Sequence, residues 1–306
     1  MRCSSAFGSI PTASELFALA CPTCRGALVD LHCATCGTTY ENVDGIWRFL
    51  PPDRAALYAQ FEHEYRVVRS AEGWGSDEPA YYRALPWQDL TGRFADLWRI
   101  RATSYRAFLD EVVSPFGGPL DIVDLGAGNG WLSYRLAQHG HNVAAVDVQT
   151  DTRDGLGAWR HYDASFMPMQ AEFDRLPLAD GQADVVVFNG SLHYSTDYTA
   201  TLQEALRVLK PAGVIAVLDS PMYPASASGA AMVDERRASF QRTYGFSSDG
   251  LASEHYLTPQ RLAQLGLRWR VITPFRGWRW VVRPWWARLR GRRAPADFPV
   301  LVGSRA

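Results

Sequence analysis

The sequence predicts an α/β fold in which a doubly wound sheet of seven strands follows a small cysteine-rich module and a helical bridge. Three observations support this prediction. Two Cys-x-x-Cys pairs lie close together near the N-terminus, a helical apolar pattern follows them, and from about residue 119 short apolar runs alternate with helical patterns and glycine turns. Such alternation is typical of a mostly parallel sheet that helices cover on both faces.

The composition is that of a globular chain with a sizeable core. Of 306 residues, 47% are hydrophobic and 21% are charged, and the formal net charge is −1 at pH 7. A chain of this length forms one or two domains, and any basic surface on it must be local. No stretch approaches about 18 uninterrupted apolar residues, the length that a transmembrane helix needs. We therefore expect a cytoplasmic protein, in a compartment where paired cysteines usually bind metal.

The first element is defined by four cysteines: Cys21 and Cys24 form one pair, and Cys33 and Cys36 form the next. Two such knuckles let four thiolates surround one Zn²⁺ at about 2.3 Å, and the residues between them suffice for a short hairpin. Since a shell of four thiolates leaves no place for water, we expect one structural zinc ion in a module too small to bury its own core. Two disulfides are the alternative. The fifth cysteine, Cys3, is interpreted as an incidental thiol.

The segment CPTCRGALVDLHCATCGTTYENVDGIWRFLP resembles the small zinc-ribbon proteins that act as activators of methyltransferases. It also resembles the ribbon that precedes bacterial ribosomal-RNA guanine methyltransferases. The resemblance covers residues 18–52, and on this basis we assign residues 1–55 to a zinc ribbon.

The second element is a helical bridge or cap over residues 56–115. Its pattern is interrupted by the glycine- and proline-containing stretches EGWGSDEP and ALPW. In residues 90–113, aromatic and aliphatic side chains recur at mostly helical spacing, which predicts a long amphipathic helix. We expect its aromatic side chains to belong to the core rather than to a ligand site.

The third element, residues 116–306, opens with a strand, a glycine turn, a helix and a second strand in the segment LDIVDLGAGNGWLSYRLAQHGHNVAAVDV. Gly126, Gly128 and Gly130 allow a ligand to lie against the backbone where the helix begins. A dinucleotide-binding turn has the pattern G-x-G-x-x-G, whereas this chain has G-x-G-x-G followed by Trp131. The third glycine is therefore displaced from the dinucleotide pattern.

Two acidic residues narrow down the ligand of this turn. Asp124 stands just before the turn, where a carboxylate repels a pyrophosphate and attracts an ammonium group. Asp147 ends the second strand and is placed to accept hydrogen bonds from both hydroxyls of a ribose. We therefore expect a ligand with an amine, a ribose and no phosphate, a description that S-adenosylmethionine meets.

The pattern continues through the pieces AEFDRLPLADGQADVVVFNGSLHY and ALRVLKPAGVIAVLD. Together with VDLGAGNG and VAAVDV, they resemble the class I S-adenosylmethionine-dependent methyltransferases of the small-molecule or type 11 sort. The resemblance covers residues 119–221. It implies a Rossmann-like, seven-strand methyltransferase sheet.

The same resemblance implies roles for individual residues. The three glycines would line the methionine and ribose portion of the cofactor, Asp124 would lie near its amine, and Asp147 would hold its ribose. Glu172 would accept a hydrogen bond from the adenine amino group, with Phe173 beside the ring. Asn189 would end the fourth strand beside the reactive methyl group. For Glu172, a solvated loop acid is the alternative.

The acceptor chemistry is less defined by the sequence. Methyl transfer is an in-line displacement that needs proximity, orientation and sometimes a base. His193 follows the fourth strand where acceptors dock and is the candidate catalytic base, with a packing or capping histidine as the alternative. The stretch NGSLHY lacks the Asn-Pro-Pro-aromatic pattern of amino-group methylation on nucleobases or glutamine, which weakens a nucleic-acid N-methylation function. The methylated atom, O, N or C, stays open.

Residues 221–257 lie outside this pattern and form an insertion with the composition of a substrate lid. His255 and Tyr256 at its end are secondary candidates for the pocket. A surface loop is the alternative.

The segment 268–293 holds nine Arg, four Trp besides Trp269, and no acidic residue. Interleaved Arg and Trp suit an anionic membrane contact through residues 276–293, a lipid-linked substrate, or RNA. A connector that packs its Trp faces and solvates its Arg side chains is the alternative. Residues 298–306 are then expected to close the sheet as an antiparallel edge strand.

These observations predict a methyltransferase that uses S-adenosylmethionine and acts on a small-molecule or lipid-linked acceptor. An RNA (rRNA or tRNA) methyltransferase that holds its substrate with the ribbon is the alternative enzyme. Residues 1–60 contain four basic and five acidic side chains, which is poor for phosphate contacts. A non-catalytic, cofactor-binding scaffold protein is the alternative of another class, and the intact acid–glycine–acid series argues against it. The oligomeric state is not predicted.

Overall fold

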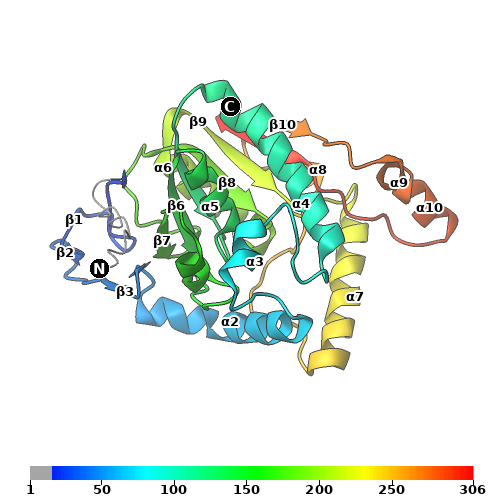
Figure 1. The fold of residues 1–306 in the computed structure, drawn as a ribbon, viewed down its shortest axis with the longest axis horizontal. Coiled ribbons are helices and arrows are strands. Elements are labelled where there is room, and N and C mark those ends of the chain that lie inside the picture. The colour runs from blue at the N-terminus through cyan, green and yellow to red at the C-terminus, as the bar shows by residue number, and fades with distance from the viewer. Residues whose placement is uncertain (1–15, 306) are drawn as a thin grey trace, which may run out of the picture.

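A computed structural model describes residues 16–305, and a nine-stranded sheet forms its centre (Figure 1). The strand order is β10-β11-β9-β8-β5-β6-β7-β4-β3. The strands are β3 (Glu41–Val43), β4 (Ile46–Arg48), β5 (Asp121–Leu125), β6 (Asn142–Asp147), β7 (Met167–Gln170), β8 (Ala183–Asn189), β9 (Leu209–Leu218), β10 (Leu267–Ile272) and β11 (Val300–Arg305). A separate two-stranded sheet pairs β1 (Leu28–Val29) with β2 (His32–Cys33).

The helices are α2 (Pro52–Glu72), α3 (Pro79–Ala84), α4 (Ala95–Phe108), α5 (Trp131–Gln138), α6 (Tyr198–Val208), α7 (Ser226–Tyr244), α8 (Pro259–Ala263), α9 (Trp278–Val281) and α10 (Arg283–Leu289). None of the helices in the described part of the chain is long and apolar enough to cross a membrane.

Seven of the nine strands form the predicted doubly wound sheet. β5 pairs in parallel with both β6 and β8, and β7 and β9 continue the parallel pairing outward on the two sides. The α5 helix packs with the core on one face and α6 with the core on the other. The predicted α/β fold is therefore confirmed.

The sequence led us to expect the C-terminal strand at the edge of the sheet, and this prediction is wrong. β11 runs antiparallel between β9 and β10, so β10 is the edge strand. Val300, Leu301 and Val302 of β11 are buried, which suits an interior position. The alternating Arg residues of β10, Arg268 and Arg270, suit a strand that is open to solvent.

The ribbon adds the two remaining strands to the sheet. β4 pairs in parallel with β7, with Trp47 opposite Met169, and β3 pairs antiparallel with β4. This pairing covers an edge of β7 that would otherwise present unpaired backbone groups. The domain boundaries at residues 55 and 115 stay predictions.

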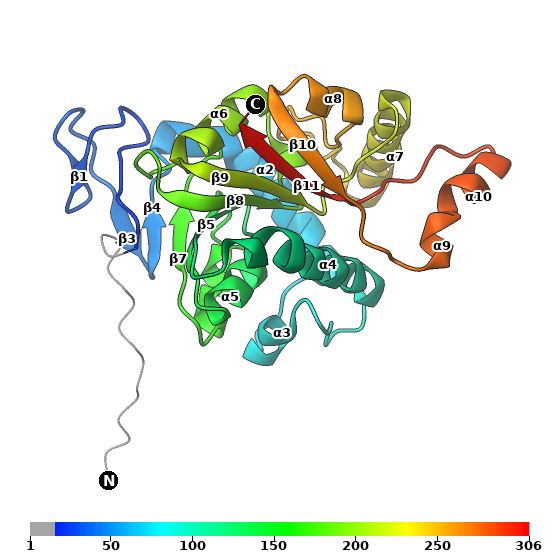
Figure 2. The same cartoon turned by 90° about the horizontal axis from the view of Figure 1, so that it is seen from above.

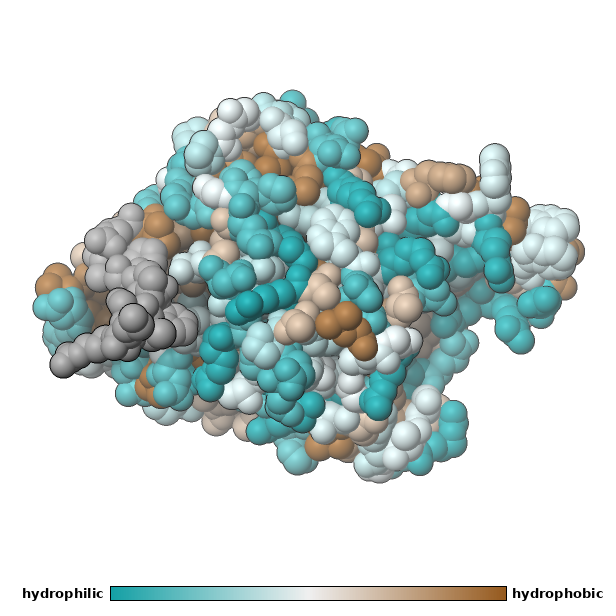
Figure 3. All heavy atoms as spheres, viewed as in Figure 1, coloured by the Kyte–Doolittle hydropathy of each residue, from teal (hydrophilic) through white to brown (hydrophobic). Residues whose placement is uncertain are grey.

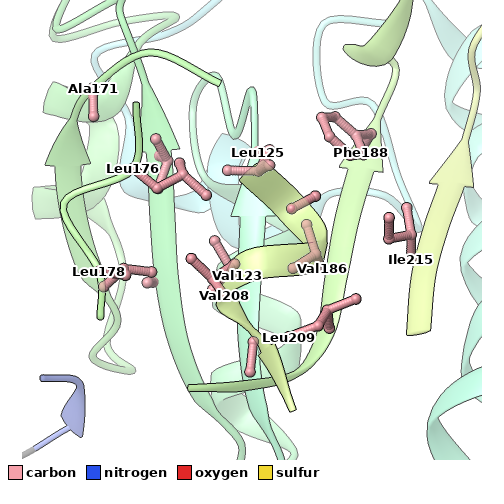
Figure 4. Packing of buried hydrophobic residues seen from close by; sticks show 14 of the residues in the cluster. Val123, Leu125, Ala171, Leu176, Leu178, Val186, Phe188, Val208, Leu209 and Ile215 are labelled. Carbon is pink, nitrogen blue, oxygen red and sulfur yellow. The ribbon is translucent and has the colours of Figure 1, made fainter. Parts of the chain in front are cut away.

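The core forms a layer on each face of the sheet because successive side chains of a strand point to opposite faces. On β5, Val123 and Leu125 pack in the cluster that includes Phe188 and the α6 side chains, shown in Figure 4. Ile122, which precedes Val123 in β5, packs in the other cluster, with Trp131 of α5. Each such buried side chain contributes about 1.5–3 kcal/mol.

The long helix predicted over residues 90–113 is shorter in the structure. Asp89 accepts hydrogen bonds from the backbone N–H of Thr91 and Phe94, and Gly92 has a φ of 69°, so a turn precedes α4. After α4 the chain continues through one π-helical turn over Leu109–Val113. The aromatic residues Trp98, Tyr105 and Phe108 are buried, which confirms that they belong to the core.

Two small substructures lie at opposite ends of the molecule. The ribbon with β1 and β2 occupies one end, and α9 and α10, inserted between β10 and β11, project from the other (Figures 1 and 2). The sheet and the helices α2 to α6 lie between them.

Candidate functional site

A pocket opens at the carboxyl ends of β5, β6 and β8, where the strand order reverses. Ligands of open α/β sheets bind at this place. The loops after these strands form one wall, and side chains of α2 and α4 form another. Five of the predicted cofactor residues line the pocket: Gly126, Gly128, Asp147, Phe173 and Asn189.

The glycine turn brings backbone to the pocket surface. Gly126 and Gly128 have φ values of +75° and +55°, which side-chain-bearing residues rarely adopt. A Cβ on Gly126 would lie 2.3 Å from Cβ of Ser191, whereas a Cβ on Gly128 would meet nothing closer than 4.0 Å. A side chain at Gly128 would therefore occupy pocket space. Gly130 instead precedes α5 as its N-cap residue, and a Cβ there would lie 2.7 Å from the ring of Phe166.

Asp147 is the acidic group of the pocket wall at the end of β6. Its Oδ2 accepts from the backbone N–H of Gly128 and its Oδ1 from that of Gln149, both at 2.8 Å. Burial raises the pKa of Asp147 to about 6. These two donors fix the carboxylate and leave further lone pairs for a ligand.

Asp124 lies beneath the glycine turn and does not line the pocket. It is fully buried, and its Oδ2 accepts from Ser133 Oγ at 2.7 Å. Its Oδ1 is buried without a hydrogen-bond partner among residues 16–305. Burial raises the pKa of Asp124 to about 7. Its predicted contact with the cofactor amine stays a prediction.

Glu172 also lies outside the pocket lining, because side chains of α2 hold its carboxylate. Arg54 Nε donates to both carboxylate oxygens, at 3.1 and 3.0 Å, and Tyr58 Oη donates at 2.9 Å. The neighbouring Phe173 does line the pocket, and its ring packs edge-on against Phe188 with centroids 5.8 Å apart. Of the two residues predicted to contact adenine, Phe173 therefore lines the pocket and Glu172 does not.

His193 is buried behind the pocket wall rather than exposed in it. Its Nδ1 lies 3.2 Å from Ser220 Oγ, and burial lowers its pKa to about 3. The next residue, Tyr194, lines the pocket. His255 is buried as well, and burial lowers its pKa to about 4. This placement matches the packing alternative for His193, and its role as a base stays a prediction without support from the geometry.

The sequence reasoning missed the contribution of α2. Tyr58, Phe61, Tyr65 and Arg69 of this helix line the pocket. Their spacing of three and four residues places them on one helix face. This spacing could have predicted that the four side chains share a face of the helix, but not that this face lines the pocket. Arg69 forms an ion pair with Asp154, another lining residue.

Arg101 of α4 is a further pocket residue that the sequence reasoning missed. Its guanidinium lies 4.6 Å from the ring of Trp98. It forms no ion pair or side-chain hydrogen bond with any of the described residues, and burial lowers its pKa. An anionic group on a ligand would supply the partner that this cation lacks.

The four paired cysteines come together in the ribbon. The Sγ atoms of Cys21, Cys24, Cys33 and Cys36 all lie within 4.8 Å of one another. The separations Cys21–Cys36 (3.6 Å) and Cys24–Cys33 (3.4 Å) are too long for disulfide bonds. Four sulfur atoms at these distances can surround one tetrahedral metal ion.

Comparison with known proteins gives a match over the part of the chain that contains the glycine turn and Asp147. Residues 123–217 match the family model described as "Methyltransferase domain". The chain is 30% identical over 124 residues to the malonyl-[acyl-carrier protein] O-methyltransferase of Pectobacterium atrosepticum, covering 40% of this chain and 46% of that protein. It is 33% identical over 152 residues to the demethylmenaquinone methyltransferase of Beutenbergia cavernae, covering 49% of this chain and 53% of that protein.

Among solved structures, the chain is similar to the 1,6-didemethyltoxoflavin-N1-methyltransferase of Burkholderia thailandensis, with 17% identity and a TM-score of 0.45. That alignment covers 76% of this chain and 92% of the other. The chain spans about half the length of the curated relatives it matches. The matched region begins in β5 and ends in β9, so it contains the glycine turn and the strands β6, β7 and β8.

Proposed function

We propose that the protein transfers a methyl group from S-adenosylmethionine to a small-molecule or lipid-linked acceptor. The observation that carries this proposal is the pocket wall formed by Gly128 and Asp147. Gly128 leaves space for a ligand, and the fixed carboxylate of Asp147 offers lone pairs to two ribose hydroxyls. The match to a methyltransferase domain over residues 123–217 supports the same cofactor.

The pocket residues fit the other parts of this cofactor. Phe173 would lie beside the adenine, and the unpaired cation Arg101 suits the cofactor carboxylate. Asp124 lies beneath the glycine turn, so its carboxylate would attract the cofactor ammonium group from behind the turn rather than by contact in the pocket. When bound, S-adenosylmethionine supplies a methyl group activated by its sulfonium, and Asn189 at the end of β8 would help to orient it.

The acceptor side of the pocket is rich in aromatic groups. Tyr58, Phe61, Tyr65 and Tyr194 favour an apolar or planar acceptor, because aromatic rings gain by stacking and by burial. The names of two relatives specify a carrier-linked malonyl group and demethylmenaquinone, and of these the quinone is the planar, apolar acceptor that an aromatic lining favours. Leu251 also lines the pocket, which supports the lid function of the insertion over residues 221–257.

We infer that the four clustered cysteines hold one structural Zn²⁺. The support is their mutual proximity and a complete set of four sulfur ligands, which leaves no coordination position for a substrate. The ribbon contacts the rest of the chain through Arg25, whose guanidinium donates to both carboxylate oxygens of Glu204 on α6. We keep the division into ribbon, bridge and methyltransferase domain as part of this proposal.

Two measurements test the proposed function. In equilibrium dialysis, the protein should bind S-adenosylmethionine and S-adenosylhomocysteine but not NAD⁺, since the turn lacks the dinucleotide pattern. With methyl-labelled cofactor and a fractionated cell extract, label should enter the small-molecule or lipid fraction. Label in the RNA fraction would favour the RNA methyltransferase, and cofactor binding without any labelled product would favour the scaffold protein. Tighter binding of NAD⁺ would contradict the cofactor assignment.

A further inference from the structure

The segment between β10 and β11 forms a projecting element that the methyltransferase site does not use. We call residues 275–293 the basic hairpin; it carries α9 and α10. In Figures 1 and 2 the two helices project from the body of the molecule, at the end opposite the ribbon. The basic hairpin contains seven Arg, four Trp and no acidic residue.

Three of its four tryptophans are exposed. The exposed fractions of Trp278, Trp285 and Trp286 are 76%, 58% and 48%. Trp280 packs at the base of the basic hairpin, with Arg283 stacked 3.3 Å from its ring centroid and its Nε1 donating to Asp297 at 3.0 Å, whereas Trp285 and Trp286 contact each other edge-on with centroids 5.0 Å apart. The interpretation of this segment as a connector that packs its Trp faces is therefore wrong for the three exposed rings.

Aliphatic and further aromatic groups accompany these tryptophans. The exposed large apolar residues of the basic hairpin include Phe275, Val281, Val282 and Leu289. Figure 3 shows pale and brown spheres beside teal ones at this end of the molecule. Isolated exposed apolar residues are normal, but a cluster of this kind on a projecting element indicates an interaction surface.

The cations of the basic hairpin are mostly unpaired. Within residues 16–305, Arg279, Arg288, Arg290 and Arg292 form no ion pair, whereas Arg293 pairs with Glu235 of α7. These four side chains are exposed. The surface therefore combines an apolar cluster with uncompensated positive charge.

Two arginines at the base of the basic hairpin have buried guanidinium nitrogens that lack hydrogen-bond acceptors. Arg276 Nε and Nη1 and Arg283 Nε are buried without a hydrogen-bond acceptor in the described chain. Both residues line a groove between the basic hairpin and the helices α4 and α7. Phosphate oxygens entering this groove would supply the missing acceptors.

We propose that the basic hairpin docks the protein on an anionic lipid bilayer. Tryptophan rings favour the boundary between headgroups and hydrocarbon, and arginines pair with lipid phosphates there. The exposed aliphatic groups Val281, Val282 and Leu289 gain by entering hydrocarbon but offer nucleic-acid bases no stacking surface. The lipid surface therefore accounts for the whole composition of the basic hairpin, whereas RNA accounts for the Arg and Trp only.

Vesicle sedimentation with the full chain tests this proposal. Vesicles of phosphatidylcholine mixed with phosphatidylglycerol should bind the protein, and phosphatidylcholine alone should bind it much less. Binding should weaken as salt is added, because the attraction is screened. The tryptophan fluorescence should shift to shorter wavelength in the bound state.

Two hairpin variants separate the apolar and charged contributions. Trp285→Ser with Trp286→Ser, and Arg288→Ser with Arg290→Ser and Arg292→Ser, should each reduce vesicle affinity by about tenfold or more. Trp87→Ser, at an outer position with 46% exposure, and Arg93→Ser with Arg242→Ser are the matched controls and should leave vesicle binding unchanged. Unchanged binding of S-adenosylmethionine by every variant would show that the folded pocket is intact.

Several results would overturn the proposal. Equal loss in hairpin and control variants would show that the effect is not local. Salt-sensitive binding of single-stranded RNA with no vesicle binding would assign the surface to nucleic acid. A dimer that dissociates in the hairpin variants, again without vesicle binding, would assign it to a second copy of the chain.

Discussion

Arg54, in the first turn of α2, holds the carboxylate of Glu172 in the loop after β7. The side chain of Glu172 is 1% exposed and that of Arg54 is 25% exposed, so the pair is largely removed from solvent. Tyr58 completes the arrangement by donating to Glu172 Oε1. This contact attaches α2 to the sheet beside the pocket, and it occupies the oxygens that the family resemblance assigned to adenine.

Arg54→Met should therefore destabilise the protein. Removing one partner of a buried ion pair costs about 3–5 kcal/mol, and the partial exposure of Arg54 reduces the expected loss to about 2 kcal/mol. Glu172→Gln in the same chain should recover part of it, because no buried charge is then left unpaired. Urea denaturation measures both changes. Arg175→Met is the control, since Arg175 is 44% exposed and lies 3.9 Å from the same carboxylate. Equal losses for Arg54→Met and Arg175→Met would contradict a structural role for Arg54.

Cofactor affinity should depend on pH through Asp147. Burial raises the pKa of this carboxyl to about 6, so it is ionised above that pH and protonated below it. Protonation removes an acceptor from the ribose site, so affinity should fall as the pH falls through about 6, by about fivefold between one unit above and one unit below. Dialysis across this range measures the effect. Asp147→Asn should bind weakly with no such dependence, and a parallel decline in this variant would assign the titration to another group.

Asp124→Asn should stabilise the protein at alkaline pH. The folded-state pKa of Asp124 is about 7 because of burial, above its ordinary value of 3.8. The folded state therefore holds this proton more tightly than the unfolded state, and the contribution of Asp124 to stability is lost as pH rises through about 7. Asparagine carries no charge. The free energy of unfolding of Asp124→Asn should therefore exceed that of the parent protein by more above pH 7 than near pH 5, with a difference on the order of 1 kcal/mol. Urea unfolding at both pH values checks this, and an equal gain at both would show that burial does not raise the pKa of Asp124.

The metal proposal predicts one zinc ion per chain by elemental analysis. Cys24→Ser removes one of four clustered ligands and should release the metal and loosen the ribbon. Hydrogen exchange should rise at β1 to β4 and remain slow at β5, β8 and β9, which are buried centrally. Cys3 lies outside the described residues and is predicted to be an incidental thiol, so Cys3→Ser should retain the zinc. A metal-free protein whose ribbon is fully protected would exclude a structural zinc site.

The elements with local sequence signals were predicted well. The strand, glycine turn, helix and strand from β5 to β6 appear as expected, and the four cysteines lie together. Both predictions depend on short spacings within the chain. Gly128 and Asp147 could thus be placed in one pocket because the βαβ unit brings its two strands side by side.

The features that the sequence did not predict depend on distant partners. Glu172 carries the motif of a cofactor contact, yet its carboxylate is held by Arg54, which lies 118 residues earlier. The interior position of β11 depends on its pairing with both β9 and β10, and the local sequence of β11 does not specify these two partners. The burial of His193 likewise depends on Ser220 and on the insertion packed beside it.

Titration calorimetry with S-adenosylmethionine tests the central claim most directly. The parent protein should bind one cofactor molecule, and Asp147→Ala should bind at least about tenfold more weakly, because it lacks the acceptor for two ribose hydroxyls and charged hydrogen bonds contribute about 1.5–3 kcal/mol each. Asp96→Ala, at a side chain that is 91% exposed, should bind like the parent. No binding by the parent, or equal binding by the parent and Asp147→Ala, would contradict the assignment of this pocket to S-adenosylmethionine.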